Sequence, residues 1–210
     1  MKKFLKKTIC ISLIGFCLLK LEKAQSIVPY YYFPTKKSLK KESISISKNA
    51  YQLLYFGRFE ESLNLAKLAV KINSTNEKLW LILSEIEVAN KLYKNALNSL
   101  NKAQEINPKI SEIYFAKSNI YLLISQNKNA KNALEKGLVI EPNNHKAIFQ
   151  LGNIFLLEKN YLEAIKFFDK SVRIEPNFWQ AINNKGLAYF EKNNINLSIK
   201  LFEKAISIQD

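Results

Sequence analysis

The apolar residues of the chain recur, over most of its length, at the spacing of one α-helical face. Residues 146–158 place Ile148, Leu151 and Phe155 three or four positions apart, which is the period of an amphipathic helix. The next stretch, residues 161–174, repeats the spacing with five members: Tyr161, Ala164, Ile165, Phe168 and Val172. Two polar residues separate the stretches, so the pattern predicts two antiparallel helices joined by a short turn.

This helix pair is one unit of a repeat with a period of 34 residues. Pro108, Pro142 and Pro176 lie 34 apart. Proline lacks an amide hydrogen and clashes with the preceding turn, so each one ends a second helix. The same interval separates two further sets: Ala96, Ala130, Ala164 and Ile106, Ile140, Ile174, Ile208. A period in this range is typical of stacked arrays. The register predicts five units: 43–76, 77–110, 111–144, 145–178 and 179–210.

The identity of the recurring residues resembles the tetratricopeptide repeat (TPR) family. Small residues occupy three repeat positions at which two helices approach closely: Ala50, Ser84, Ser118, Gly152, Gly186; Ser62, Ala96, Ala130, Ala164, Ser198; and Ala69, Ala103, Gly137, Ser171, Ala205. The resemblance implies an all-α fold, a right-handed superhelical solenoid of about five antiparallel helix pairs, because one pair cannot bury its apolar faces alone. The first unit has atypical residues, as expected of a capping repeat.

The N-terminal residues 1–26 have the pattern of an export signal. Four lysines precede an apolar run over residues 8–19, and Ala24-Gln25-Ser26 fits the small-x-small pattern of a cleavage site. An uncleaved membrane anchor is the alternative, since charged residues stand close to that site. Both interpretations place the rest of the chain outside the cytoplasm, in a periplasm or thylakoid lumen, or anchored to the membrane. Both cysteines, Cys10 and Cys17, lie in the apolar run, so a cleaved chain has no thiol chemistry.

Residues 27–42 are predicted to be a linker rich in aromatic residues and lysines. Pro29 and Pro34 favour an extended conformation. A spacer explains the composition, and a contact with a membrane surface or nucleic acid is the alternative.

The net charge of +14 suggests a nucleic-acid or anionic-membrane ligand until the charges are located. Residues 1–26 carry +5 and residues 27–42 carry +3, which leaves +6 spread over the repeats. Most basic residues are Lys rather than Arg, the residue favoured for phosphate recognition. A basic protein that binds nucleic acid or anionic lipid is therefore the alternative function, and a steep salt dependence of binding would support it.

The resemblance implies a concave groove, lined by residues of the first helix of each unit, that binds a peptide or protein. The predicted groove residues are Tyr51, Tyr55, Glu85, Phe115, Asn119, Phe149, Asn153, Asn183 and Leu187. Asn donates to and accepts from a peptide backbone, and the apolar residues would hold side chains. Packing between repeats is the alternative role for some of them. TPR domains that grip acidic C-termini use Lys where this chain has Phe115 and Phe149, which argues against that subtype.

The last unit ends after its second helix, and this predicts an apolar docking or self-association edge. Its residues are Ile195, Ile199, Phe202 and Ile206. Side chains that fold over the end are the alternative.

Residues for catalysis or cofactor binding are scarce. His145 is the only histidine, so no second His completes a metal pair, and the glycines form no phosphate-binding loop. We expect no enzyme activity, no cofactor and no metal. The sequence instead indicates an exported interaction scaffold or assembly factor, and TPR proteins of bacteria and plastids commonly serve that role.

Overall fold

The computed structural model describes residues 36–209, and every regular element in that range is an α-helix. Residues 1–26, predicted to be the export signal, lie outside the described residues, as does most of the predicted linker. The helices are α2 (Lys36–Tyr55), α3 (Phe59–Ile72), α4 (Glu77–Ala89), α5 (Tyr93–Ile106), α6 (Ser111–Leu123), α7 (Asn127–Ile140), α8 (His145–Leu157), α9 (Tyr161–Ile174), α10 (Trp179–Glu191) and α11 (Ile195–Gln209).

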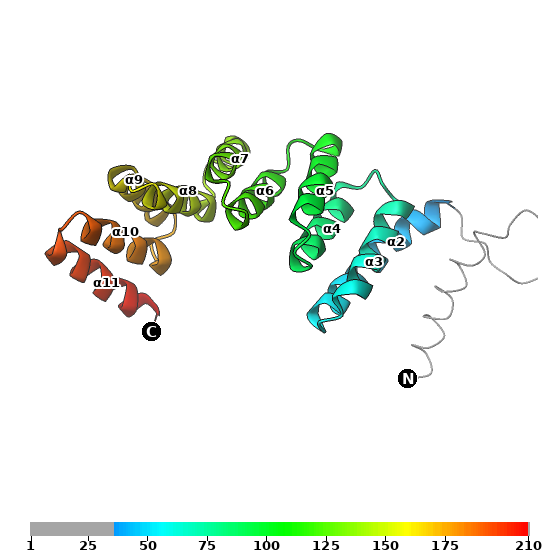
Figure 1. Cartoon of the computed structure of the whole chain (residues 1–210), viewed down its shortest axis with the longest axis horizontal. Coiled ribbons are helices and arrows are strands. Elements are labelled where there is room, and N and C mark those ends of the chain that lie inside the picture. The colour runs from blue at the N-terminus through cyan, green and yellow to red at the C-terminus, as the bar shows by residue number, and fades with distance from the viewer. Residues whose placement is uncertain (1–35, 210) are drawn as a thin grey trace, which may run out of the picture. The chain divides into compact units, whose positions relative to one another are not determined.

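The helices pack as five successive pairs, from α2 with α3 to α10 with α11 (Figure 1). Each second helix also packs against the first helix of the next pair, as α3 does against α4 and α9 against α10. The prediction of an all-α solenoid of antiparallel helix pairs is thereby confirmed. Contacts run between neighbouring pairs, so the hydrophobic core is a chain of clusters rather than one centre.

Small residues allow the two helices of a pair to approach closely. Ala96, Ala130 and Ala164 are fully buried at the same repeat position. A Cβ atom added to Gly152 of α8 would lie 2.6 Å from Cε1 of Phe168 on α9, a distance that real Cβ atoms do not tolerate. Because Phe168 is itself fully buried, its ring fills the space that the missing side chain leaves.

The turn inside each pair has the same backbone conformation. Lys91, Ser125, Lys159 and Asn193 have φ near 60°, and Gly57 takes the equivalent place with φ of 72°. The following amide closes the turn, as Leu92 N donates to the Glu87 carbonyl at 2.8 Å. This left-handed residue followed by a long backward hydrogen bond is a Schellman-type C-cap, and three residues separate the two helices of every described pair.

Helix α2 differs from the expected layout at its start. It spans 20 residues against 13 for α4, because it begins at Lys36, inside the segment 27–42 predicted to be a linker. After Pro34 the sequence holds no helix breaker, and Lys, Ser, Leu and Glu are compatible with a helix. No helix among residues 36–209 is both long and apolar enough to cross a membrane.

Candidate functional site

The first helices of the pairs present the predicted groove residues to different degrees. Tyr51, Tyr55, Glu85, Asn119 and Leu187 are exposed. Asn153 and Asn183 are half-buried, and so are Phe115 and Phe149. The structure therefore separates this set into exposed side chains and side chains engaged in packing.

Side-chain amides connect three successive first helices. Gln150 Nε2 on α8 donates to Asn119 Oδ1 on α6 at 2.7 Å. Asn184 Nδ2 on α10 donates to Asn153 Oδ1 on α8 at 2.8 Å, and Asn183 Nδ2 donates to Asn184 Oδ1 at 3.2 Å. We call these five residues the amide ladder. Each primary amide offers two donors and an acceptor, so the ladder retains capacity for further hydrogen bonds.

A cavity of about 500 Å³ lies beside the amide ladder. Its lining includes Gln150 and Asn153 of the ladder together with Leu122, Ser125, Asn127, Ile154 and Leu157. Leu157 is 68% exposed, and Leu123 at the equivalent position of α6 is 57% exposed. The region thus combines amide hydrogen-bonding groups with exposed aliphatic side chains, which is the combination that holds a peptide backbone and its side chains.

The rings of Phe115 and Phe149 pack inside the helix pairs. Phe115 lies directly against Gly137 of α7, at a place where a Cβ atom would collide with the ring. The Phe149 ring centroid lies 5.8 Å from that of Phe168 and 5.1 Å from that of Phe178. Packing was the alternative role that the sequence left open for some predicted groove residues, and these two rings are packed.

Glu85 contributes a carboxylate to the first-helix surface of α4. Partial desolvation raises its pKa, and the carboxylate of Glu112 on α6 raises it further. Like charges on neighbouring helices favour a cationic group between them.

The turn between α2 and α3 carries a cluster of exposed aromatic rings. Tyr55 is 88%, Phe56 72% and Phe59 48% exposed. The rings of Tyr55 and Phe56 meet edge to face with centroids 5.6 Å apart. Tyr55 is among the groove residues predicted from the sequence but Phe56 and Phe59 are not, although three aromatic residues within five positions are visible in the sequence.

The predicted docking edge on α11 is partly exposed. Ile195, Ile199 and Ile206 are 41%, 49% and 60% exposed. Phe202 is half-buried instead and lies against Gly186, where a Cβ would be 2.8 Å from its Cε1. Three isoleucines on one face of α11 therefore form an apolar surface patch.

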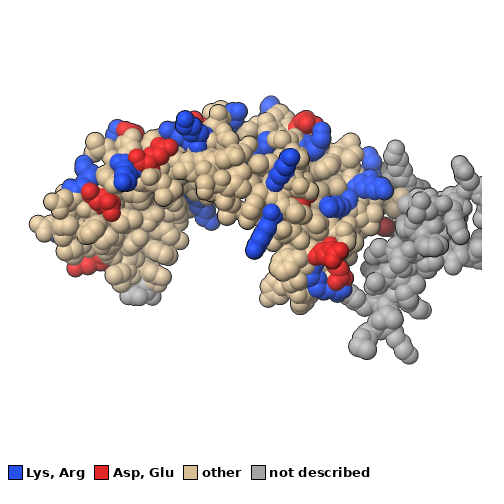
Figure 2. All heavy atoms as spheres, viewed as in Figure 1, with Lys and Arg blue, Asp and Glu red and all other residues tan. Residues whose placement is uncertain are grey.

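Residues with catalytic or metal-binding chemistry do not gather in the described range. His145 begins α8, and its ring packs edge to face on Phe178 with centroids 5.0 Å apart. Within residues 36–209, no group of three or more His, Cys, Asp and Glu side chains could hold a metal ion. Figure 2 shows Lys and Arg side chains interspersed with Asp and Glu on the face in view.

Within residues 36–209, five helix pairs with a 34-residue period and small residues at the helix contacts define a helical-repeat solenoid. The chain belongs to the tetratricopeptide repeat family, whose model matches residues 77–110, 111–144, 145–178 and 180–210. Proteins of this family are in general scaffolds for protein interaction, without catalysis of their own.

Solved structures show the same fold. A crystal structure of MamA has a TM-score of 0.69 at 23% identity, over 76% of this chain and 94% of MamA. YrrB, described as a TPR protein with an unusual peptide-binding site, has a TM-score of 0.63 at 23% identity, over 81% of this chain and 88% of YrrB. PilF of Pseudomonas aeruginosa has a TM-score of 0.71 at 13% identity, over 80% of this chain and 77% of PilF. No curated protein sequence matches the chain significantly.

Proposed function

We propose that the chain is a non-enzymatic scaffold that binds a peptide or protein partner on the first-helix surface of α6, α8 and α10. The observation that carries the proposal is the amide ladder beside the 500 Å³ cavity. The amides offer paired donors and acceptors at a spacing set by the helices, and an extended peptide backbone needs both. Peptide binding described for YrrB, which has a similar fold, supports the same class of ligand.

Site-specific crosslinking tests this assignment. A photoreactive residue at Leu157 should crosslink to the partner in the native host. The matched control is Val139 on α7, which is 82% exposed but belongs to a second helix. Asn119→Ala with Asn153→Ala should abolish the Leu157 crosslink, because the two ladder acceptors that bridge different helices are removed. Equal crosslinking from Leu157 and Val139, or full crosslinking by the double variant, would show that the partner does not bind here.

We also propose export of the chain from the cytoplasm, supported by the lysine-rich start and apolar run of residues 1–26. Residues 1–35 fused to an alkaline phosphatase that is active only outside the cytoplasm should give activity. Arg or Asp residues placed within the run should abolish it. N-terminal sequencing of the exported chain would distinguish a cleaved signal from a retained anchor.

Self-association through α11 is a second proposed interaction. The exposed faces of Ile195, Ile199 and Ile206 support it, because three neighbouring isoleucines on a solvated helix favour burial against a second apolar surface.

A further inference from the structure

One contact between the two helices of a pair has different residues in repeat 77–110 than in repeat 145–178. In repeat 145–178 the contact is formed by Phe155 and Phe167, whose rings stack with centroids 5.2 Å apart and planes 12° apart. In repeat 77–110 the same two positions hold Glu87 and Ser99. Ser99 Oγ donates to Glu87 Oε2 at 2.7 Å, and Glu87 is only 3% exposed. A polar pair thus replaces a large apolar pair.

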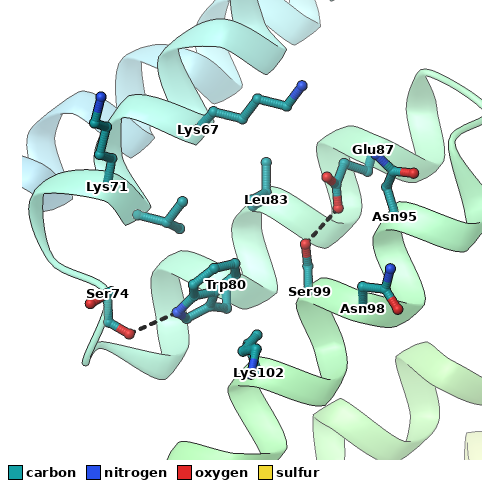
Figure 3. A pocket seen from close by; sticks show the side chains of 11 residues that line it. Lys67, Lys71, Ser74, Trp80, Leu83, Glu87, Asn95, Asn98, Ser99 and Lys102 are labelled. Carbon is teal, nitrogen blue, oxygen red and sulfur yellow. Dashed lines mark hydrogen bonds between the residues drawn. The ribbon is translucent and has the colours of Figure 1, made fainter.

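A cavity of about 590 Å³ opens where the large side chains are missing (Figure 3). It lies on the side of the second helices, between α3 and α5, with α4 as its base. The helices contribute different groups: Lys67, Val70 and Lys71 from α3; Trp80, Leu83 and Glu87 from α4; Asn95, Asn98, Ser99 and Lys102 from α5. None of these residues belongs to the amide ladder.

Packing does not explain why a carboxylate, Glu87, occupies this buried position. Burial raises the pKa of its carboxyl, against which the Ser99 hydrogen bond and the charge of Lys67 act to lower it. A buried carboxylate costs desolvation energy that a pair such as Phe155 and Phe167 would not. The hydrogen bond to Ser99 occupies Oε2, which leaves Oε1 for a donor that enters the cavity.

The rim of the cavity is positively charged. Lys67, Lys71 and Lys102 outnumber the single carboxylate of Glu87. Of these three lysines, only Lys102 has an ion pair within residues 36–209, to Glu105 at 2.7 Å, and both of those side chains are more than half exposed. Exposed pairs of this kind contribute little free energy, so Lys102 can exchange its partner. The cavity therefore suits a ligand with several negative charges.

The wall next to the lysines is apolar and fixed. Trp80 donates its indole N–H to the Ser74 carbonyl at 2.9 Å, which holds the ring in place beside Val70 and Leu83. Across the cavity, Asn95 and Asn98 present amides to the solvent side. In an acidic peptide, the apolar wall suits an apolar side chain, the amides suit the backbone and the lysines suit the carboxylates.

We propose that this cavity is a second binding site, which takes a short, extended acidic peptide segment with one apolar residue among its carboxylates. The apolar side chain packs on Trp80, the flanking carboxylates pair with Lys67, Lys71 and Lys102, and a backbone N–H donates to Glu87. The site is separate from the binding surface proposed on α6, α8 and α10, because its residues come from α3, α4 and α5.

Trp80 fluorescence reports binding directly. The experiment uses the full chain with the substitution Trp179→Phe, which leaves Trp80 as its only tryptophan. The probe is a short acetylated peptide with one Leu flanked by Asp and Glu residues. We expect a saturable change of Trp80 emission that weakens as salt is added. The same peptide with Asn and Gln in place of Asp and Glu should give no saturation, and equal binding of both peptides would overturn the proposal.

Two lysine variants in the same background locate the charges. Lys67→Gln with Lys71→Gln should weaken peptide binding by about tenfold, the effect of two partly exposed ion pairs. Lys192→Gln with Lys200→Gln removes the same charge from exposed positions of the last repeat and should change binding by less than about twofold. Equal losses in the two variants would show general attraction to a basic protein and overturn the site.

A third variant fills the cavity. Glu87→Phe with Ser99→Phe copies the stacked pair of repeat 145–178 and should abolish saturable peptide binding while the chain stays folded. Asn119→Ala with Asn153→Ala should leave the binding intact, which separates this site from the amide ladder. Peptide binding that survives cavity filling, or Trp80 quenching by an oligothymidylate but not by the acidic peptide, would overturn the proposal. If the variant with the filled cavity does not fold, the two lysine variants still test whether the peptide binds in the cavity.

Discussion

Gln150 on α8 donates a side-chain hydrogen bond to Asn119 on α6, 31 residues before it, at 2.7 Å. Asn184 and Asn153 repeat this relationship one unit further on, with the same separation and a distance of 2.8 Å. The recurrence arises because a 34-residue unit returns each first helix to the same orientation beside the previous one. Side chains at fixed places in successive units therefore meet in register, and the amide ladder is a product of the repeat itself.

Loss of one ladder acceptor should weaken the fold as well as partner binding. Asn153→Ala removes the acceptor of Nδ2 of the half-buried Asn184 and should lower the free energy of unfolding by about 1 kcal/mol. Urea denaturation measures the change. Asn132→Ala, at an exposed position of α7, is the matched control and should change it by less than about 0.5 kcal/mol. Equal stability of the two variants would mean that the Asn184–Asn153 bond contributes nothing.

The helix pairs could be predicted from sequence because the same signals recur at one period. Pro108, Pro142 and Pro176 each follow a second helix, and Ala164 lies at a helix contact as expected. The fold is thus encoded locally and repeatedly, and neighbouring units supply the rest of the packing. The start of α2 was not predicted, because the lysines after Pro34 carry no apolar period and yet form a helix.

The surface was harder to predict than the fold. Phe115 was assigned to the groove by its repeat position, but Gly137 opposite it leaves room for the ring inside the pair. Whether the Phe115 ring fits inside the pair depends on Gly137, 22 positions later in the same unit. The repeat position of Phe115 alone does not contain this information. Gln150 was missed for the opposite reason, since its role appears only when the neighbouring unit places Asn119 beside it.

Filling the contact at Gly152 should destabilise the chain. Gly152→Ala puts a Cβ 2.6 Å from a ring carbon of Phe168, which is fully buried. We expect a loss of about 1–3 kcal/mol, as for other overpacked cores. Gly186→Ala is the control, because the half-buried ring of Phe202 has room to shift. Thermal unfolding should rank the wild type above Gly186→Ala and Gly152→Ala below both.

Introducing a glycine at one turn and removing the glycine of another should change the stability of the fold in opposite directions. Lys159 has φ of 59°, a conformation that costs an L-residue about 1 kcal/mol, so Lys159→Gly should stabilise the fold by up to about that amount. Gly57→Ala introduces the same strain at φ of 72°, with no atom within 4 Å of the new Cβ, and should destabilise it by a similar amount. Both changes are read by chemical denaturation. Shifts of the same sign in the two variants would refute the conformational explanation.

Glu87 should make stability fall as the pH rises above its unfolded pKa. Burial raises the pKa of Glu87 from the ordinary 4.5, so the folded chain binds its proton more tightly than the unfolded chain does. Between the two pKa values the native state holds more protons, and stability therefore decreases with rising pH. Glu87→Gln removes this contribution while it keeps an acceptor for Ser99. The free energy of unfolding of the variant minus that of the wild type should grow above pH 4.5 and then level off, and a difference independent of pH would contradict a raised pKa.

The isoleucine face of α11 should determine how the mass of the chain depends on concentration. Ile199 and Ile206 are 49% and 60% exposed, so Ile199→Lys with Ile206→Lys changes the surface and spares the packing against α10. Light scattering over a concentration series should show a rising average mass for the wild type and a constant monomer mass for the variant, because two charges cannot be buried unpaired at an apolar contact. Val139→Lys with Leu162→Lys, at positions 82% and 61% exposed on other helices, is the control and should associate like the wild type. A wild-type chain that remains a monomer at the highest concentration would exclude self-association through α11, and association by all three proteins would place the contact elsewhere.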